Sequence, residues 1–250
     1  MMGKIVAIGG GEIGRPGYPV ETKEIDEEII RLSGKSSPRL LFIPTATSDS
    51  TTYYDSVKNH FGTRLGCKTD VLYLLANKPL KKEIEDKNFS SDIIYVGGGN
   101  TLKMMKSWRK CGVDVILEEA YRKDIVLSGL SAGAICWFRY GSSDSIKFAN
   151  PDAGLIKVRG LDFINALCCP HYHTEEDRRP HFKELMSKAP GVGLALDNCS
   201  AIEIVGDRYR IITSSSSANA YKVYYRRGQF HEEIIAQMRE FSSLESLLSK

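Results

Sequence analysis

The sequence predicts an α/β fold with a doubly wound, mostly parallel sheet, and two observations predict it. Near-continuous apolar runs such as KIVAIGG and DIIYVGGG recur along the first half of the 250-residue chain. Segments with the apolar spacing of helices separate these runs. Strands of a parallel sheet are buried on both faces and have such unbroken runs, and regular alternation with helices is typical of parallel sheets.

The expected elements of the first half follow in order. The strands are residues 4–10, 39–46, 69–75, 92–99 and 124–130. The first helix, 21–34, ends at Gly34, a residue suited to the position after a helix. The second, 48–66, begins with capping residues, and a short third helix covers 79–88. Residues 100–123 are expected to form two helices that meet near Gly112.

Beyond residue 140 the alternation of strands and helices becomes less regular. Strands are expected at 165–170 and 191–196, with a polar helix at 174–188 between them. Residues 200–214 and 219–233 are expected to be antiparallel strands that turn at Gly206-Asp207 and at Gly228. A last helix is expected at 242–250. No repeat or linker interrupts the chain, so we expect a single domain, residues 1–250.

Composition and charge exclude several classes of protein. The net charge is +3, from 34 basic and 31 acidic residues, which does not indicate a nucleic-acid or membrane partner. No apolar run reaches the roughly 18 residues that a membrane span needs, and the amino-terminal segment is expected to be a strand rather than a signal peptide. The six cysteines form no C-x-x-C motif. We therefore expect reduced thiols and a cytoplasmic protein.

Two glycine-rich segments follow expected strands. Gly9, Gly11 and Gly14 fit G-x-G-x-x-G, but a dinucleotide site needs a helix to begin there. The segment RPGYPV contains two prolines that resist this helix, so we expect a loop at the carboxyl edge of the sheet and no cofactor. VGGGNT (96–101) is expected to be a tight turn with a helix cap, and its bare N–H groups also suit an oxyanion.

Ser131 lies in GLSAG, where a strand meets a segment of helical length. A nucleophilic serine at a sharp strand-to-helix turn needs small neighbours. The N–H of Ala132 would then donate to the oxyanion, and the dipole of the helix that follows would add positive potential. The alternative is that Ser131 only caps the helix.

His171 follows another strand-like run and is expected at the same sheet edge as Ser131. Histidine suits the removal of a serine proton at neutral pH. A metal site at His171-x-His173 is the alternative, but no second ligand cluster accompanies it, so no metal is expected.

The motifs GGGNT, GLSAGA and PHY in this order resemble those of the peptidase E and cyanophycinase family of serine peptidases. The resemblance implies a three-layer, flavodoxin-like α/β/α fold akin to class I glutamine amidotransferase domains, no cofactor, and cleavage of peptide bonds next to aspartate. It assigns Ser131 as the nucleophile and His171 as the base. Ala132 with Gly98 or Gly99 would form the oxyanion hole.

The resemblance leaves two candidates for the third member of the triad. Peptidase E has an aspartate a little beyond the serine helix, which corresponds to Asp144 in YGSSDS. The cyanophycinase branch has a glutamate before a late strand, and Asn198 in ALDNCSAIEI takes that place. Asn198 can orient a histidine but cannot stabilise an imidazolium as a carboxylate does. We rank Asp144 first and Asn198 second.

An arginine beyond the catalytic histidine meets the acidic side chain of the substrate in peptidase E. By that resemblance Arg178 is the first choice and Arg179 the second, because adjacent helical residues point about 100° apart. An ion pair between Arg178 and Glu175 is the alternative. The expected protein is a serine peptidase that acts on small peptides, and the sequence is compatible with a homodimer. The rival functions are an α/β-hydrolase-type esterase and a non-catalytic binding protein.

Overall fold

The central sheet of the computed structural model contains the parallel strands that the sequence predicts. The structure describes residues 3–250, so Met1 and Met2 of the expected domain lie outside it. Neighbouring strands run parallel from one side to the other as β1, β5, β4, β2 and β3. Their bounds are Lys4–Ile8 for β1, Val126–Leu130 for β5, Ile93–Val96 for β4, Arg39–Ile43 for β2 and Lys68–Val71 for β3.

Antiparallel strands extend this sheet beyond β1. β10 (Ser200–Val205) pairs antiparallel with β1, β11 (Arg208–Thr213) pairs with β10, and the short β14 (Ser242–Ser243) pairs with β11. The eight strands have the order β14-β11-β10-β1-β5-β4-β2-β3. The carboxyl end of β1 therefore lies between the carboxyl end of β5 and the amino end of β10.

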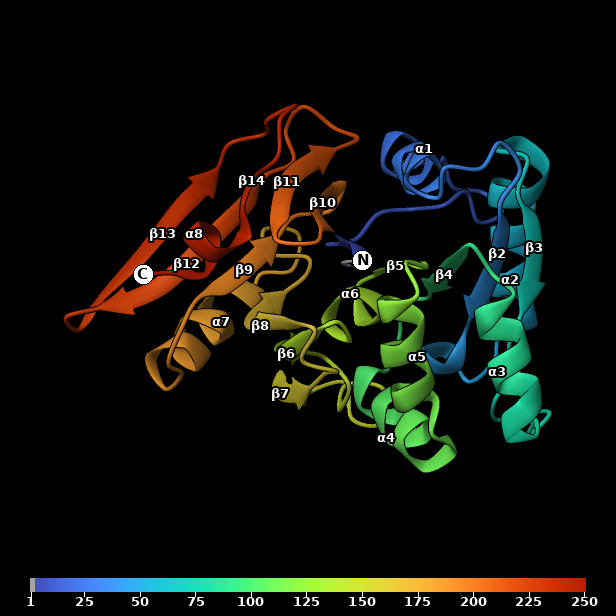
Figure 1. Ribbon diagram of the computed structural model, residues 1–250. Coiled ribbons are helices and arrows are strands. Elements are labelled where there is room, and N and C mark those ends of the chain that lie inside the picture. The colour runs from blue at the N-terminus through green and yellow to red at the C-terminus, as the bar shows by residue number, and fades with distance from the viewer. Residues whose placement is uncertain (1–2) are drawn as a thin grey trace.

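Helices cover both faces of the central sheet and make three layers, as the sequence predicts. Alternate residues of β1 point to opposite faces: Val6 and Ile8 pack in one core cluster, and Ile5 and Ala7 in another. In Figure 1, α1 lies above the parallel strands and α4 and α5 lie below them. The helices on the Val6 side are α1 (Lys23–Leu32) and α2 (Thr51–Val57), which continues as a π-helical segment (Lys58–Arg64). Those on the Ile5 side are α3 (Lys81–Phe89), α4 (Thr101–Cys111) and α5 (Val113–Arg122).

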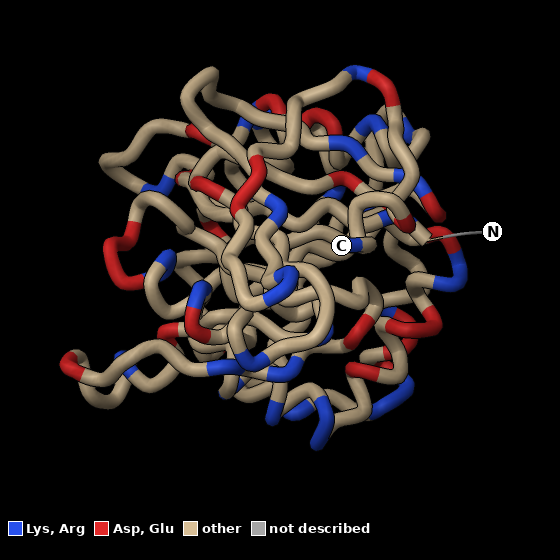
Figure 2. The backbone as a smooth tube through the Cα atoms, turned by 90° about the vertical axis from the view of Figure 1, so that its left-hand side faces the viewer, with Lys and Arg blue, Asp and Glu red and all other residues tan. Residues whose placement is uncertain are grey.

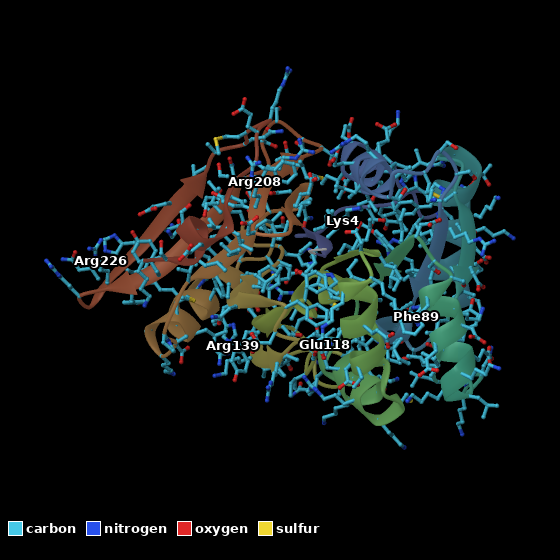
Figure 3. The ribbon with its side chains drawn as sticks, viewed as in Figure 1. Lys4, Phe89, Glu118, Arg139, Arg208 and Arg226 are labelled. Atoms are coloured by element: carbon cyan, nitrogen blue, oxygen red, sulfur yellow. The ribbon has the colours of Figure 1, made fainter. Side chains whose placement is uncertain are left out.

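A second, six-stranded sheet has the order β13-β12-β9-β8-β6-β7. Its strands are β6 (Phe138–Ser143), β7 (Ile156–Arg159), β8 (Ile164–Cys169), β9 (Gly193–Leu196), β12 (Ala220–Arg226) and β13 (Gln229–Ile235). The helix α7 (Arg178–Ser187) packs Phe182 and Met186 on one face of it. The hairpin β12–β13 extends to the left in Figure 1, and Figure 3 shows Arg226 near its tip. The C-terminal antiparallel strands are thus present, but they are divided between two sheets.

The segment after Ser131 differs from the sequence-based expectation. The helix there, α6 (Ala132–Ile135), has only four residues, and the apolar chain that follows becomes β6. The backbone carbonyl of Cys136 accepts a hydrogen bond from the N–H of Leu161 at 2.7 Å, and that of Trp137 accepts one from Ile164 at 3.0 Å. These carbonyls face a neighbouring segment, which ends the helix. α6 is therefore too short to supply the dipole expected from a full-length helix.

The loop between β1 and α1 contains no helix in its first part, as its prolines predict. It forms a small excursion in which Ile13 pairs with Val20 in an isolated antiparallel bridge. At the opposite end of β1, the Lys4 ammonium lies 2.9 Å from the Asp124 carboxylate, which precedes β5 (Figure 3). Acidic and basic positions are interspersed along the chain (Figure 2). Within residues 3–250, no helix combines the length and apolar character that crossing a membrane requires.

Candidate active site

Ser131 occupies a strained turn between β5 and α6. Its backbone has φ 55° and ψ −110°, outside the φ/ψ regions that residues other than glycine favour. The flanking glycines are required by close packing. A Cβ atom on Gly129 would lie 2.6 Å from the carbonyl oxygen of Val96, and one on Gly133 would lie 2.1 Å from it. The small neighbours of the serine therefore let this turn rest directly on the end of β4.

Consecutive carbonyl groups at the end of β1 hold the segments that carry the site. Ile8 accepts from the N–H of Ser131 at 3.0 Å. Gly9 accepts from the N–H of His171 at 3.2 Å, and Gly10 from that of Cys199, next to Asn198, at 2.9 Å. The carboxyl end of β1 is thus the common support of residues that are far apart in the sequence.

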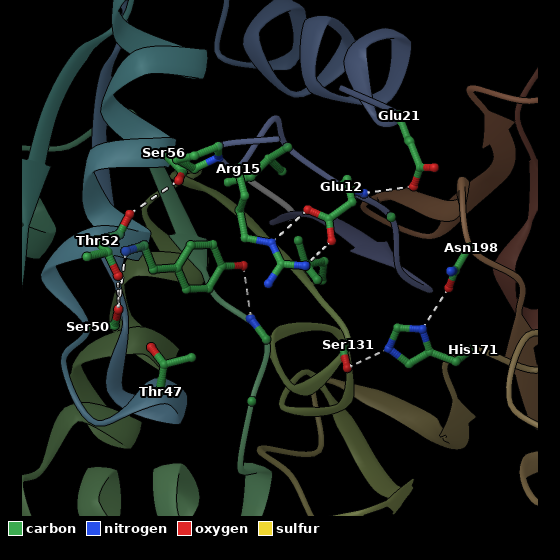
Figure 4. A pocket seen from close by; sticks show the side chains of 17 residues that line it. Glu12, Arg15, Glu21, Thr47, Ser50, Thr52, Ser56, Ser131, His171 and Asn198 are labelled. Atoms are coloured by element: carbon green, nitrogen blue, oxygen red, sulfur yellow. Dashed lines mark hydrogen bonds and ion pairs between the residues drawn. The ribbon is translucent and has the colours of Figure 1, made fainter. Parts of the chain in front are cut away.

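Ser131, His171 and Asn198 form a hydrogen-bonded chain (Figure 4). The Nε2 atom of His171 lies 2.9 Å from the Oγ atom of Ser131, and its Nδ1 atom lies 2.6 Å from the Oδ1 atom of Asn198. Because an amide oxygen only accepts, Nδ1 carries the proton in this arrangement and Nε2 is free to accept the serine proton. The structure thus brings Ser131 and His171 together with Asn198, which is one of the two candidates for the third residue that the sequence suggests.

Burial lowers the pKa of His171 below its ordinary value of 6.5. The Glu175 carboxylate opposes this effect, and so does the hydrogen bond from Nδ1 to Asn198. The desolvation effect is the largest, so the neutral imidazole prevails at neutral pH. A neutral imidazole is the form that accepts a proton.

The structure places Asp144 away from Nδ1 of His171. It follows β6, and its carboxylate lies 3.8 Å from the guanidinium of Arg178. Asn198 fills the position next to Nδ1 instead, because the turn between β9 and β10 is held against Gly10. Of the two candidates for the third member, Asn198 and not Asp144 contacts His171 in the structure.

Arg178 and Arg179 lie outside the cavity that contains Ser131. Arg178 is 1% exposed, and it donates from Nε to Glu175 at 2.6 Å and from Nη1 to the carbonyl of Ser142 at 3.0 Å. Arg179 pairs with Glu232 on β13, with Nη2 2.6 Å from the carboxylate. Buried and paired in this way, Arg178 links the end of β6 to the segment after His171. The geometry matches the ion pair with Glu175 that the sequence offered as the alternative.

Backbone N–H groups converge near Ser131. A Cβ atom on Gly98 would lie 3.4 Å from the Cβ of Ser131, which places this turn beside the serine. The N–H of Gly98 donates to the Tyr53 hydroxyl at 3.3 Å. Within the described part of the chain, the N–H groups of Gly99 and Ala132 have no acceptor. Those two N–H groups are free to donate to a bound oxygen atom.

A cavity of about 480 Å³ opens next to Ser131 (Figure 4). The triad residues line one side, the β1–α1 loop lines the second, and α2 with the turn before it lines the third. The lining side chains with charge are Glu12, Arg15 and Glu21. The space suits a short peptide with its carbonyl group beside the serine.

Comparison with known families decides the class of this site. The model of "Peptidase family S51" matches residues 5–212. The chain belongs to peptidase family S51. It is therefore a serine peptidase, as the motifs predict, and the family assignment disfavours the esterase and the non-catalytic binding protein.

Relatives agree with the assignment. Over 226 residues the peptidase is 38% identical to the "Uncharacterized peptidase YgaJ" of Bacillus subtilis, a match that covers 89% of this chain and 92% of that one. It is 30% identical over 162 residues to the "Uncharacterized peptidase Lmo0363" of Listeria monocytogenes, covering 63% and 73%. It is also 30% identical over 112 residues to "Peptidase E" of Salmonella typhi, covering 40% and 45%.

Solved structures show the same fold. A peptidase from an acI-B1 actinobacterium superposes with a TM-score of 0.73 at 17% identity and covers 97% of both chains. A putative peptidase E protein from Listeria monocytogenes gives a TM-score of 0.64 at 20% identity, covering 86% of this chain and all of that one.

Three features of the peptidase's cavity were not found from the sequence. They are Arg15, Tyr53 and the close passage of Gly10 over the contact between His171 and Asn198. The sequence does carry one signal for Arg15, because the loop after β1 was expected at the carboxyl edge of the sheet. A charged residue in such a loop is a candidate for substrate contact. Tyr53 and Gly10 carried no comparable signal.

Proposed function

We propose that this peptidase hydrolyses small peptides after an acidic residue, with Ser131 as nucleophile, His171 as base and Asn198 as its orienting partner. The observation that carries the proposal is the chain of contacts from Ser131 Oγ through His171 to Asn198, at 2.9 and 2.6 Å. Its position at the wall of a peptide-sized cavity supports the assignment.

The reaction follows from the direction of the hydrogen bonds. His171 Nε2 takes the proton of Ser131, and Oγ attacks the carbonyl carbon of the scissile bond. The N–H groups of Ala132 and Gly99 stabilise the oxyanion. His171 then gives its proton to the leaving amine. Water repeats the sequence on the acyl-enzyme, with His171 again as the base.

Asn198 performs part of what a carboxylate does in a serine triad. Its Oδ1 atom fixes the tautomer and orientation of His171, but it adds no negative charge to stabilise the imidazolium. The Glu175 and Asp144 carboxylates favour the charged form of His171 without touching Nδ1, but the Arg178 guanidinium, which pairs with both of them, opposes this effect.

Two observations support the small, acidic substrate. The cavity is limited to about 480 Å³, which holds few residues, and a guanidinium group lies in its wall. A relative of the chain is named peptidase E, and the family that carries this name acts next to aspartate by the resemblance described above.

The test is a panel of dipeptides that differ only in the residue before the scissile bond. We expect the highest kcat/KM for an aspartyl or glutamyl residue. The Ser131→Ala variant should fold and lose cleavage of every member. If purified Ser131→Ala retains the wild-type rate, the serine mechanism fails, and if neutral residues are preferred, the acidic specificity fails.

A further inference from the structure

The β1–α1 loop forms a rigid wall of the cavity. The N–H of Glu21 donates to the carbonyl of Glu12 at 2.7 Å, and Ile13 pairs with Val20 across the loop. Ile13 is 2% exposed and packs into the core beneath α1 and α2. This pairing closes the loop at its base, so the residues between carry side chains in a defined position.

Arg15 projects from this wall with 54% of its side chain exposed, and Glu12 and Tyr18 contact its guanidinium. Its Nε atom donates to Glu12 at 2.8 Å, and its Nη2 atom contacts the other oxygen of the same carboxylate. The ring of Tyr18 lies 5.1 Å from the guanidinium carbon. The two contacts to Glu12 occupy one edge of the guanidinium, and Nη1 has no acceptor within residues 3–250. Figure 4 shows the Arg15 side chain extending into the cavity that Ser131 also lines.

Tyr53 connects the wall of this cavity to the turn beside Ser131. Tyr53 lines the same cavity, and its hydroxyl accepts from the N–H of Gly98, the glycine beside Ser131. Arg15 and Ser131 line this cavity together with Tyr53, so a substrate that fills it contacts both the guanidinium and the serine.

No other arginine or lysine lines this cavity in the part of the chain that the structure describes. Arg178 and Arg179 are engaged with Glu175 and Glu232. A guanidinium with a free donor edge suits a carboxylate, because both groups are planar and match in a fork geometry.

We infer that Arg15 binds the acidic side chain of the substrate and that Glu12 positions the guanidinium for this contact. Arg15 is thus the specificity-determining residue, in place of the arginines of α7. The inference rests on the proposed function, since it concerns the substrate of the same site.

The chain contains a matched pair for the control. Arg31 contacts Glu28 with the same spacing and through the same atoms as Arg15 contacts Glu12, with Nε at 2.7 Å from the carboxylate. It lies on α1 and does not line the cavity. Arg31→Gln therefore removes an ion pair of the same geometry without touching the site, and Glu28 keeps its second partner, Arg210, at 2.6 Å.

The experiment measures kcat/KM for an aspartyl dipeptide and for the asparaginyl dipeptide of the same shape, on wild type, Arg15→Gln and Arg31→Gln. We expect Arg15→Gln to lower the value for the aspartyl peptide about fivefold, the upper part of the range for an ion pair of an exposed side chain. The value for the asparaginyl peptide should change little, because it has no charge to leave unpaired. Arg31→Gln should leave both values at the wild-type level.

The outcomes separate the inference from the proposed function. Retention of the aspartyl preference in Arg15→Gln overturns the role of Arg15 and leaves the acidic specificity standing. An equal loss on both peptides also overturns it, because Arg15 then supports the loop and not recognition. A wild-type enzyme that cleaves both peptides equally well contradicts the acidic specificity itself. Wild-type cleavage of neither peptide contradicts the proposed substrate class.

Discussion

Two histidines two residues apart have partners that are adjacent in the sequence, and their surroundings differ. His171 contacts the amide of Asn198 and the hydroxyl of Ser131. His173 contacts the carboxylate of Asp197 at 3.0 Å, and 42% of its side chain is exposed. The charged partner thus belongs to the histidine that lies away from the serine.

The backbone explains why the pairs do not exchange. His171 has φ 54°, a left-handed conformation, and its N–H is tied to Gly9. Asp197 is held on its own side by the N–H of Asn219 at 3.1 Å and the hydroxyl of Tyr221 at 3.4 Å. A carboxylate one residue away in sequence is therefore unavailable to the base. We propose His171 as the base because it contacts Ser131, and not because of the charge of its partner.

The largest expected difference between the pairs is in activity. His171→Ala should lower kcat by about 10⁴-fold or more, the scale for loss of a triad member. His173→Ala should change kcat by about threefold or less, as expected for a surface substitution worth ~0.5 kcal/mol. Steady-state kinetics on an acidic dipeptide checks both. An active His171→Ala beside an inactive His173→Ala would mean that the base is assigned to the wrong histidine.

The second expected effect concerns Gly10, which passes over the His171–Asn198 contact. A Cβ atom there would lie 2.2 Å from Asn198 Oδ1 and 2.4 Å from the Cε1 atom of His171. Gly10→Ala must therefore displace the base, and a displacement of about 1 Å costs about 100-fold in kcat. Gly154→Ala is the matched control, because a Cβ atom at Gly154 meets nothing within 4 Å. Equal kinetics of the two variants would show that this contact is not needed.

The Asn198→Asp variant gives His171 a carboxylate partner, as His173 has in the wild type. A carboxylate at position 198 favours the imidazolium and raises the pKa of His171 from its burial-lowered value. Activity is lost as the pH falls through this pKa, because the imidazolium cannot accept a proton. The acid limb of kcat/KM should therefore lie below pH 6.5 in wild type and move about 1–2 pH units upward in Asn198→Asp.

Asn198→Ala is the control for this shift. It should lower the rate while the acid limb stays low, because it adds no charge. An acid limb that does not move in Asn198→Asp would contradict the contact between position 198 and the base.

The smallest expected effect on activity belongs to the outer pair. Asp197→Asn weakens the contacts to His173 and Asn219, and it should lower the free energy of unfolding by about 1–3 kcal/mol. Because His171 does not use this carboxylate, kcat should stay near that of wild type. Urea unfolding and kinetics on the same preparation measure both quantities, and a large loss of kcat without a loss of stability would place Asp197 in the triad.

The parallel sheet could be predicted because its strands are short, apolar and separated by helical segments. The short helix and the strand formed by residues 132–143 could not be predicted. Their apolar character fits a buried helix as well as a buried strand, and the choice depends on the carbonyl contacts of Cys136 and Trp137 with a distant segment. The division of the C-terminal strands between two sheets likewise depends on pairings between remote segments.

Ser131 and His171 could be predicted because strand ends in a parallel sheet share one edge. The contact of His171 with Asn198 rather than with Asp144 could not be predicted, because both residues occupy plausible positions in the sequence. The deciding feature is the hydrogen bond that ties residue 199 to the carbonyl of Gly10, which the sequence does not show. The choice of Glu175 as the partner of Arg178 could not be predicted either, because it depends on how α7 packs.

If His171 activates Ser131, the serine should react with a fluorophosphonate, and this reaction can be measured without a peptide substrate. The measurement is the labelling rate of wild type, Ser131→Ala, His171→Ala and His173→Ala, with the modified residue located by peptide mass mapping. We predict one adduct, on Ser131, with a rate that falls steeply in His171→Ala and stays at the wild-type level in His173→Ala. An adduct on another residue, or a labelling rate that does not depend on His171, would contradict the account.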